Sequence, residues 1–188
     1  KSVTFFRSPA AFRDVAILEY RLSGLVTDRW LYQPSLRRTR RMAATADESV
    51  LGGDLTTHDF EPLATLPARL FPDDAIVLRG DARMDGVEVF IVEYSTNHDA
   101  TYRKAVLWLG KEDSVVRCLE LYDESGRLTK RITATDIRVV GRILVAFRIE
   151  GETMDSSSRT VVQLEIVVFD QGIDDNLFTE GALGRGGK

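Results

Sequence analysis

From Asp74 onward, apolar and polar residues alternate along the chain with the period of two that is typical of β-strands. The pattern predicts later strands at 76–84, 87–94, 102–109, 115–122, 128–135, 137–140, 143–150 and 161–169, and shorter early strands at 3–7, 15–21, 29–33 and 37–42. Brief turns such as Asp85-Gly86 join the later strands, and connections this short link only antiparallel neighbours. The sequence therefore predicts a mainly β, antiparallel fold with residues 1–188 in a single domain.

Three segments depart from this alternation. Residues 54–70 carry two prolines and are predicted to form short helical turns and loop. The polar stretch 151–159 is predicted to be a loop. Residues 174–183 begin with an aspartate pair, place apolar residues at helical spacing and precede a glycine-rich end, which predicts a short closing helix.

The later strands hold more apolar residues than one buried face requires. In 161–169 both alternating sets are largely apolar, and Ile143, Val145, Phe147 and Ile149 form a further apolar set. Two short helices cannot cover so many strands, so the sheet must curl on itself or leave apolar surface for another molecule. A lined ligand cavity and an interior filled by side chains both remain open.

Alternation proposes a lining for such a cavity. The favoured face carries Val89, Ile91, Val106, Trp108, Leu119, Leu121, Val145 and Phe147, which are apolar positions from the middle of the later strands. Trp30 and Tyr32 share one face of an early strand, either as sheet core or as rim residues of the ligand site. A one-residue error in register would move every side chain of a strand to the other face.

Charge and hydropathy exclude several classes of function. The formal net charge is −4, so no overall positive field attracts nucleic acid, and no nucleic-acid partner is predicted. In a strand, Arg38 and Arg40 face one way while Arg37 and Arg41 face the other, which is typical of a solvated edge strand. No apolar run approaches the roughly twenty residues that span a bilayer.

Candidate catalytic and metal-binding residues are few. Cys118 is the only cysteine, which rules out an intrachain disulfide and indicates a small core residue. The motifs HExxH, paired CxxC and GxSxG are absent. We predict no enzyme, no cofactor and no metal site, although a catalytic group built on His58, Asp54 and Asp59 remains the alternative.

Three consecutive segments resemble the LolA-like outer membrane lipoprotein-sorting family: "FFRSPAAFRDVAILEYRL", "DRWLYQPSLRRTRRM" and "LGGDLTTHDFE". The later "ELYDESGRLTKRI" and "IDDNLFTEGAL" resemble its closing elements. The resemblance implies a strongly curved antiparallel sheet, an incomplete barrel, with short helices covering its concave side. It also implies that the family's N-terminal helix and first strands precede Lys1.

The resemblance further implies a function. Family members are exported and carry acyl chains across the periplasm, so we expect a periplasmic carrier of lipid or lipoprotein. Its partners would be the acyl chains and a membrane exporter complex or outer-membrane receptor. The loop of the "GSDF" type would be a lid or partner contact, and it holds Gly52, Gly53, Asp54, His58 and Phe60. The alternative is a non-enzymatic module that docks on an exporter or receptor.

Overall fold

A computed structural model of the chain describes residues 1–8, 10–22, 25–42, 74–97, 101–156 and 158–186. The chain divides into two compact units. The first comprises Lys1–Leu51 and Asp170–Lys188, and the second comprises Gly52–Phe169. Helix is scarce and both units are built on antiparallel sheets, which confirms the predicted mainly β class. The helices of the described ranges include none long and apolar enough to cross a bilayer.

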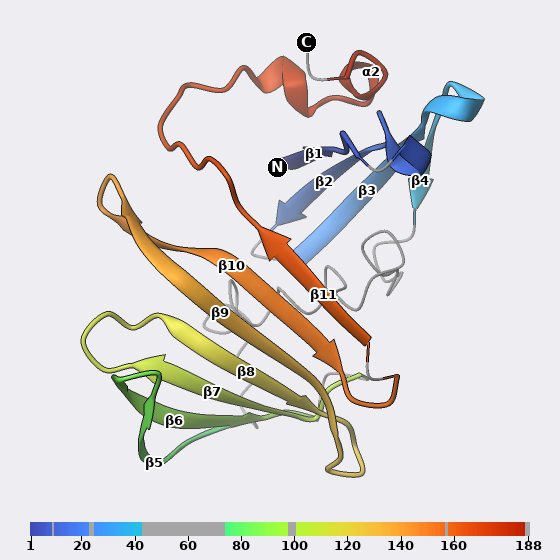
Figure 1. Ribbon diagram of the computed structural model, residues 1–188. Helices are drawn as coiled ribbons and strands as arrows, with labels where there is room; N and C mark the ends of the chain where they lie inside the picture. The colour runs from blue at the N-terminus through green and yellow to red at the C-terminus, as the bar shows by residue number, and fades with distance from the viewer. Residues whose placement is uncertain (9, 23–24, 43–73, 98–100, 157, 187–188) are drawn as a thin grey trace. The chain divides into compact units, whose positions relative to one another are not determined.

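The first unit contains a four-stranded sheet in the order β1-β2-β3-β4 (Figure 1). Its strands are β1 (Ser2–Phe5), β2 (Ala16–Leu22), β3 (Leu25–Gln33) and β4 (Arg38–Met42), and the 3-10 helices η1 (Ala10–Phe12) and η2 (Pro34–Leu36) lie in its connections. β4 pairs with β3 alone among the described strands, and its arginines alternate between the two faces. This confirms the interpretation of the arginine-rich segment as an edge strand, where charge opposes pairing with other chains.

The C-terminal segment closes the core of the first unit with two short helices, η6 (Asp175–Phe178) and α2 (Glu180–Leu183). The Asp174 carboxylate caps η6 by accepting a hydrogen bond from the Asn176 backbone N–H at 2.9 Å. The Tyr20 hydroxyl donates to the Phe178 carbonyl at 2.6 Å. The core combines Ala16, Leu18 and Leu183 with Val3, Phe5, Tyr20, Trp30, Tyr32 and Phe178. The predicted closing helix is confirmed.

An ion pair between β2 and β3 is buried in the first unit. Arg29 Nε donates to Glu19 Oε1 at 2.8 Å between β3 and β2, and less than a tenth of either side chain is exposed. A second hydrogen bond to Glu19 comes from the Ser2 hydroxyl at 3.4 Å. Two charges removed from water are tolerable only when each compensates the other, so the pair constrains how β2 and β3 join.

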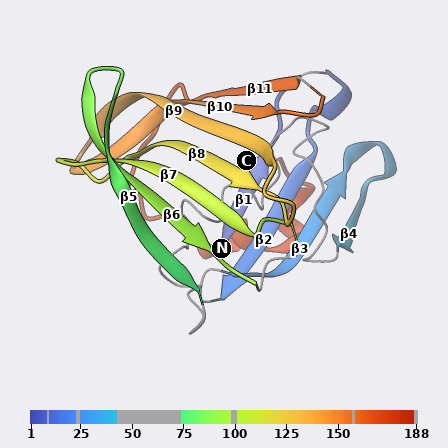
Figure 2. The same cartoon turned by 90° about the horizontal axis from the view of Figure 1, so that it is seen from below.

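The second unit is a seven-stranded antiparallel sheet in the order β11-β10-β9-β8-β7-β6-β5. The strands are β5 (Ala75–Met84), β6 (Val87–Ser95), β7 (Lys104–Gly110), β8 (Val116–Tyr122), β9 (Leu128–Val140), β10 (Ile143–Thr153) and β11 (Ser158–Gln163). The sheet is strongly twisted and curved, so that β5 and β11 run in very different directions (Figure 2). The strand meander follows chain order, as the short turns predicted.

The predicted boundaries were wrong around the last three strands. β9 is continuous through Asp136, which takes a positive φ of 52° and so absorbs an irregularity where two strands were expected. β10 extends to Thr153 and β11 begins at Ser158, within the expected loop, because Gly151 pairs with Thr160. Residues 164–169 lie outside the strand, and Ile166 and Val168 are exposed rather than buried on two faces.

Candidate functional site

The candidate site is a pocket of about 500 Å³ on the seven-stranded sheet. Seven of its ten lining residues are apolar; the lining consists of Asp113, Ser114, Val115, Val116, Ile132, Ala134, Arg142, Leu144, Ala146 and Ile149. The turn between β7 and β8 forms one wall, and β9 and β10 supply the rest. An apolar surface of this kind attracts apolar ligands because burying it removes it from water.

An irregularity between β9 and β10 shapes the wall of the pocket. Strict alternation would place Ala146 and Ile149 on opposite faces of β10, yet both line the pocket. Asp136, in the facing part of β9, has the left-handed φ of 52°. The strand pair therefore departs from regular pleating there. As a result, both Ala146 and Ile149 of β10 reach one surface.

An ion pair holds the wall made by the turn between β7 and β8. Arg117 donates to both carboxylate oxygens of Asp113, from Nη1 to Oδ1 at 3.0 Å and from Nη2 to Oδ2 at 2.6 Å. The Val115 backbone N–H also donates to Asp113 Oδ1 at 3.0 Å. A Cβ on Gly110 would collide with the Asp113 carboxylate and the Arg117 guanidinium, so the pair requires a glycine at that position. The Arg117 hydrogen bonds, with smaller help from Val115, lower the pKa of Asp113 to about 2.

This pKa makes a prediction about acid stability. Because the folded-state pKa of Asp113 is depressed from 3.8 to about 2, its contribution is complete above pH 3.8 and is lost as pH falls through about 2. Asp113→Asn should lower the free energy of unfolding by about 2 kcal/mol at pH 6. Urea denaturation from pH 6 to pH 2 should show the difference from wild type shrinking toward zero. A pH-independent difference would contradict the assignment.

The opposite face of β8 and β9 is polar. Arg131 donates to Glu120 Oε1 from Nε at 3.0 Å and from Nη2 at 2.8 Å, and the Tyr122 hydroxyl donates to Glu120 Oε2 at 2.6 Å. Burial and this hydrogen bond raise the pKa of Tyr122 to about 12. Burial, with the Glu120 charge, raises the pKa of Cys118 to about 11, so the thiol stays protonated near neutral pH as expected of a core residue. A ligand with an apolar chain would find its surface on the other face.

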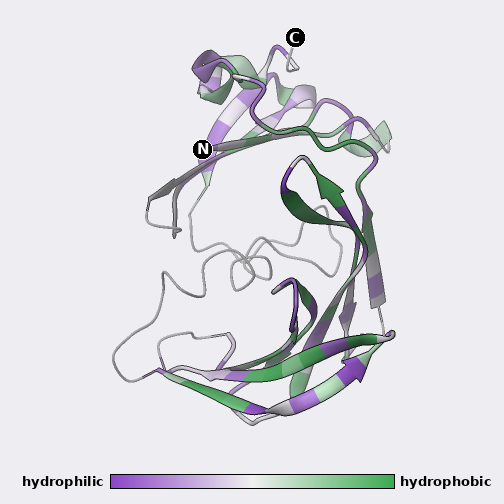
Figure 3. Cartoon of the chain, turned by 90° about the vertical axis from the view of Figure 1, so that its left-hand side faces the viewer, coloured by the Kyte–Doolittle hydropathy of each residue, from purple (hydrophilic) through white to green (hydrophobic). Residues whose placement is uncertain are grey.

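The strand register divides the strand residues that were predicted to line a cavity between the two faces of the sheet. Val106 pairs with Glu120, so Val106 lies on the same side of the sheet as Glu120, together with Trp108, Ile91 and Val89. Leu119 pairs with Leu107 and Ile132, so Leu119 and Leu121 lie on the pocket side. The proposed set therefore mixes both faces. Figure 3 shows hydrophobic and hydrophilic residues alternating along the strands. Alternation alone does not fix which residues of neighbouring strands lie on the same side of the sheet.

The other predicted residues are placed as follows. Val145 pairs with Arg138, whose guanidinium lies 4.2 Å from the centre of the Phe147 ring, so these side chains form a cluster of their own. Trp30 and Tyr32 pack in the core of the first unit, and the Trp30 and Tyr20 rings make an edge-type contact with 4.9 Å between their centres. None of the ten predicted cavity residues is among the lining residues of the pocket. The predicted lid residues Gly52, Gly53, Asp54, His58 and Phe60 lie outside the described residues.

Sequence reasoning missed most of the pocket. One signal was present in β10, where the charged residues Arg148, Glu150 and Glu152 all occupy alternate positions and share one face. This alternation would have pointed to Ile149 on the other face. The backbone conformation at Asp136, which hydropathy does not reveal, was needed to place Leu144 and Ala146 on the same surface.

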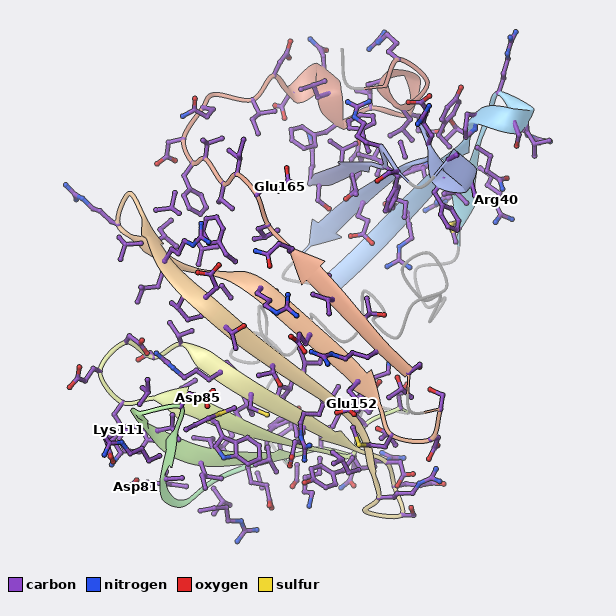
Figure 4. The ribbon with its side chains drawn as sticks, in the orientation of Figure 1. Arg40, Asp81, Asp85, Lys111, Glu152 and Glu165 are labelled. Carbon is purple, nitrogen blue, oxygen red and sulfur yellow. The ribbon has the colours of Figure 1, made fainter. Side chains whose placement is uncertain are left out.

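Other charged side chains of the second unit form ion pairs with each other. Lys111 Nζ lies 2.5 Å from Asp81 Oδ2, and Figure 4 shows the two side chains together where β5, β6 and β7 meet. Arg138 donates to both oxygens of Asp136, at 2.8 and 2.6 Å. Within the described ranges, His, Cys, Asp and Glu side chains form no group of three that could hold a metal ion.

Comparisons with known proteins define the family and the fold. A family model described as "-like: Uncharacterized protein" matches residues 1–185, and the chain belongs to that family. Among curated proteins, none matches the sequence. Three solved structures of similar fold confirm the resemblance to LolA-like proteins.

The first of these structures is a putative outer membrane lipoprotein-sorting protein domain from Vibrio parahaemolyticus, with a TM-score of 0.81 and 23% identity over 97% of this chain and 77% of that one. The second is a DUF1329 family protein from Desulfovibrio piger, with a TM-score of 0.84 and 23% identity over 96% and 75% of the two chains. The third is a LolA superfamily protein from Nitrosomonas europaea, with a TM-score of 0.63 and 22% identity over 95% and 76%. These similarities establish a LolA-like fold.

Proposed function

We propose that the protein is a non-enzymatic carrier of lipid or lipoprotein that binds an acyl chain on its seven-stranded sheet. The observation that carries this proposal is the pocket of about 500 Å³ with seven apolar residues among ten. Its volume falls in the range of about 300 to 1,000 Å³ that ligand pockets occupy. Its charged residue Asp113 is neutralised by Arg117, so no free carboxylate opposes an apolar chain.

The energetics favour a long apolar ligand. Each buried methylene contributes about 0.8 kcal/mol, so a chain of moderate length gives useful affinity without any specific contact. Leu144 of the pocket wall is 39% exposed, and a bound chain would cover it. The Asp113–Arg117 ion pair therefore holds one wall of the pocket in place, and the wall keeps an apolar surface accessible to a ligand.

The fold supports the remaining parts of the proposal. Two solved structures of the same fold carry descriptions as a lipoprotein-sorting domain and a LolA superfamily protein. From this similarity we propose a periplasmic location and a single LolA-like domain whose curved sheet forms an incomplete barrel. We also propose that the partner is an exporter complex or an outer-membrane receptor. The lid at Gly52 to Phe60 and the ten predicted cavity residues stay predictions.

A titration with a fluorescent fatty acid tests the proposal. The purified chain should bind it saturably with about one molecule per chain, and an unlabelled fatty acid should displace it. Heat-unfolded protein provides the control for nonspecific uptake. Absence of saturable uptake by the folded chain would contradict a carrier role.

A second candidate function is a non-enzymatic module that docks on a lipid exporter or outer-membrane receptor. The edge of the seven-stranded sheet favours it, because Ile76 and Leu78 of β5 are 54% and 61% exposed. An exposed apolar edge strand is a surface to which another protein can add a strand. A folded chain that takes up no fatty acid would move the assignment to this module.

A further inference from the structure

Arg142 lines the pocket, and within the described part of the chain no carboxylate compensates its charge. It follows Gly141, whose φ of 63° makes the tight turn between β9 and β10, and this turn presents Arg142 at the pocket. Among the described residues, Arg142 makes no hydrogen bond or ion pair. An unpaired guanidinium beside apolar wall residues has five donors available for an anion.

Two other charged groups near the pocket form ion pairs of their own. Asp113 is held by both terminal nitrogens of Arg117. Arg138, the second arginine of the hairpin, donates to both carboxylate oxygens of Asp136. Of the two charged lining residues, Asp113 is neutralised by Arg117, and the positive charge of Arg142 remains.

The apolar wall extends from this charge along one strand. Arg142 directly precedes β10, and the wall residues Leu144, Ala146 and Ile149 lie within this strand. The seven residue steps from Arg142 to Ile149 cover roughly 23 Å at the usual strand rise. An extended chain lying along β10 would reach Arg142 at one end and Ile149 at the other.

We propose that this pocket selects amphiphiles with an apolar chain and an anionic headgroup, and that Arg142 binds the headgroup. The headgroup is a carboxylate or a phosphate, since the guanidinium fork matches both with two parallel hydrogen bonds. This inference rests on the proposed acyl-chain binding, to which it adds the charge class and the orientation of the ligand.

Calorimetric titration with matched twelve-carbon ligands tests the inference. Dodecanoate, dodecyl phosphate, dodecanol and dodecylamine are each added to the full chain at pH 8, below their aggregation concentrations. Dodecanoate or dodecyl phosphate should bind at least ten-fold tighter than dodecanol, and dodecylamine should bind most weakly. The stronger of the two anions identifies the source, a free fatty acid for the carboxylate and a phospholipid for the phosphate.

Two variants complete the test. Arg142→Gln should weaken the preferred anion about ten-fold and leave dodecanol unchanged. Arg83→Gln is the control, because Arg83 is an exposed arginine of the β5–β6 hairpin outside the pocket lining, and it should change neither. Equal binding of all four ligands by the wild type, or an Arg142→Gln variant that keeps the preference, would overturn the headgroup assignment while preserving acyl-chain binding. Failure of every ligand, dodecanol included, would overturn the proposed function itself.

Discussion

Ala146→Phe is expected to reduce fatty-acid affinity at least ten-fold while the chain remains folded. Ala146 is a half-buried wall residue of the pocket, so the larger ring extends into the 500 Å³ space rather than into packed core. It fills volume that the acyl chain would otherwise occupy. The measurement is displacement of a fluorescent fatty acid, with circular dichroism to establish folding.

The neighbouring residue supplies the matched control. Val145→Phe places the same ring on the other side of β10, where Val145 pairs with Arg138 and not with the pocket wall. This variant should retain wild-type affinity. Equal loss in both variants would mean that the ligand does not occupy this pocket.

Breaking the buried ion pair of the first unit should have the largest effect on stability. Arg29→Met removes the positive charge whose Nε lies 2.8 Å from the buried Glu19 carboxylate. We expect the free energy of unfolding to fall by about 3 to 5 kcal/mol. In a Trp108→Phe background, fluorescence of Trp30, which packs in the same core, reports urea unfolding of this unit.

Two controls separate the buried charge from charge in general. Lys1→Ala removes an exposed pair with Asp175, at 3.3 Å, and should cost under about 1 kcal/mol. The double variant Glu19→Leu with Arg29→Met removes both buried charges and should recover most of the lost stability. A single Arg29→Met variant as stable as Lys1→Ala would show that the charge at Glu19 is hydrated.

Local patterns in the sequence predicted the strands because each depends on few residues. The alternation around Asp85-Gly86 gave a hairpin, and Asp174 with the apolar residues after it gave the closing helix. The arginines of β4 indicated an edge strand, which the four-stranded sheet contains. These features follow from side-chain period and turn chemistry, which operate over a few positions.

The site could not be predicted in the same way, because it depends on how strands pair. Leu119 and Val106 both appeared as apolar positions, yet pairing with Glu120 places Val106 on the polar face. Register is a long-range property, and a shift of one residue exchanges the faces. The left-handed φ of Asp136, which brings Ala146 to the pocket, belongs to backbone geometry rather than to hydropathy.

The two faces of the second unit also explain the excess of apolar residues in the later strands. The polar network of Glu120, Arg131 and Tyr122 satisfies one face with side chains of the protein itself. On the other face, Leu107, Leu119 and Ile132 form a buried core, and the pocket adjoins Ile132. The apolar surplus therefore fills a buried core on part of the sheet and lines the pocket beside it.

Native mass spectrometry of the purified chain, followed by solvent extraction, tests the carrier proposal most directly. We predict a mass increment equal to about one lipid per chain, a single anionic lipid class in the extract, and loss of both in Ala146→Phe but not in Val145→Phe. A chain at its bare mass, with no lipid extracted and none bound after incubation with fatty acid, would contradict the carrier account.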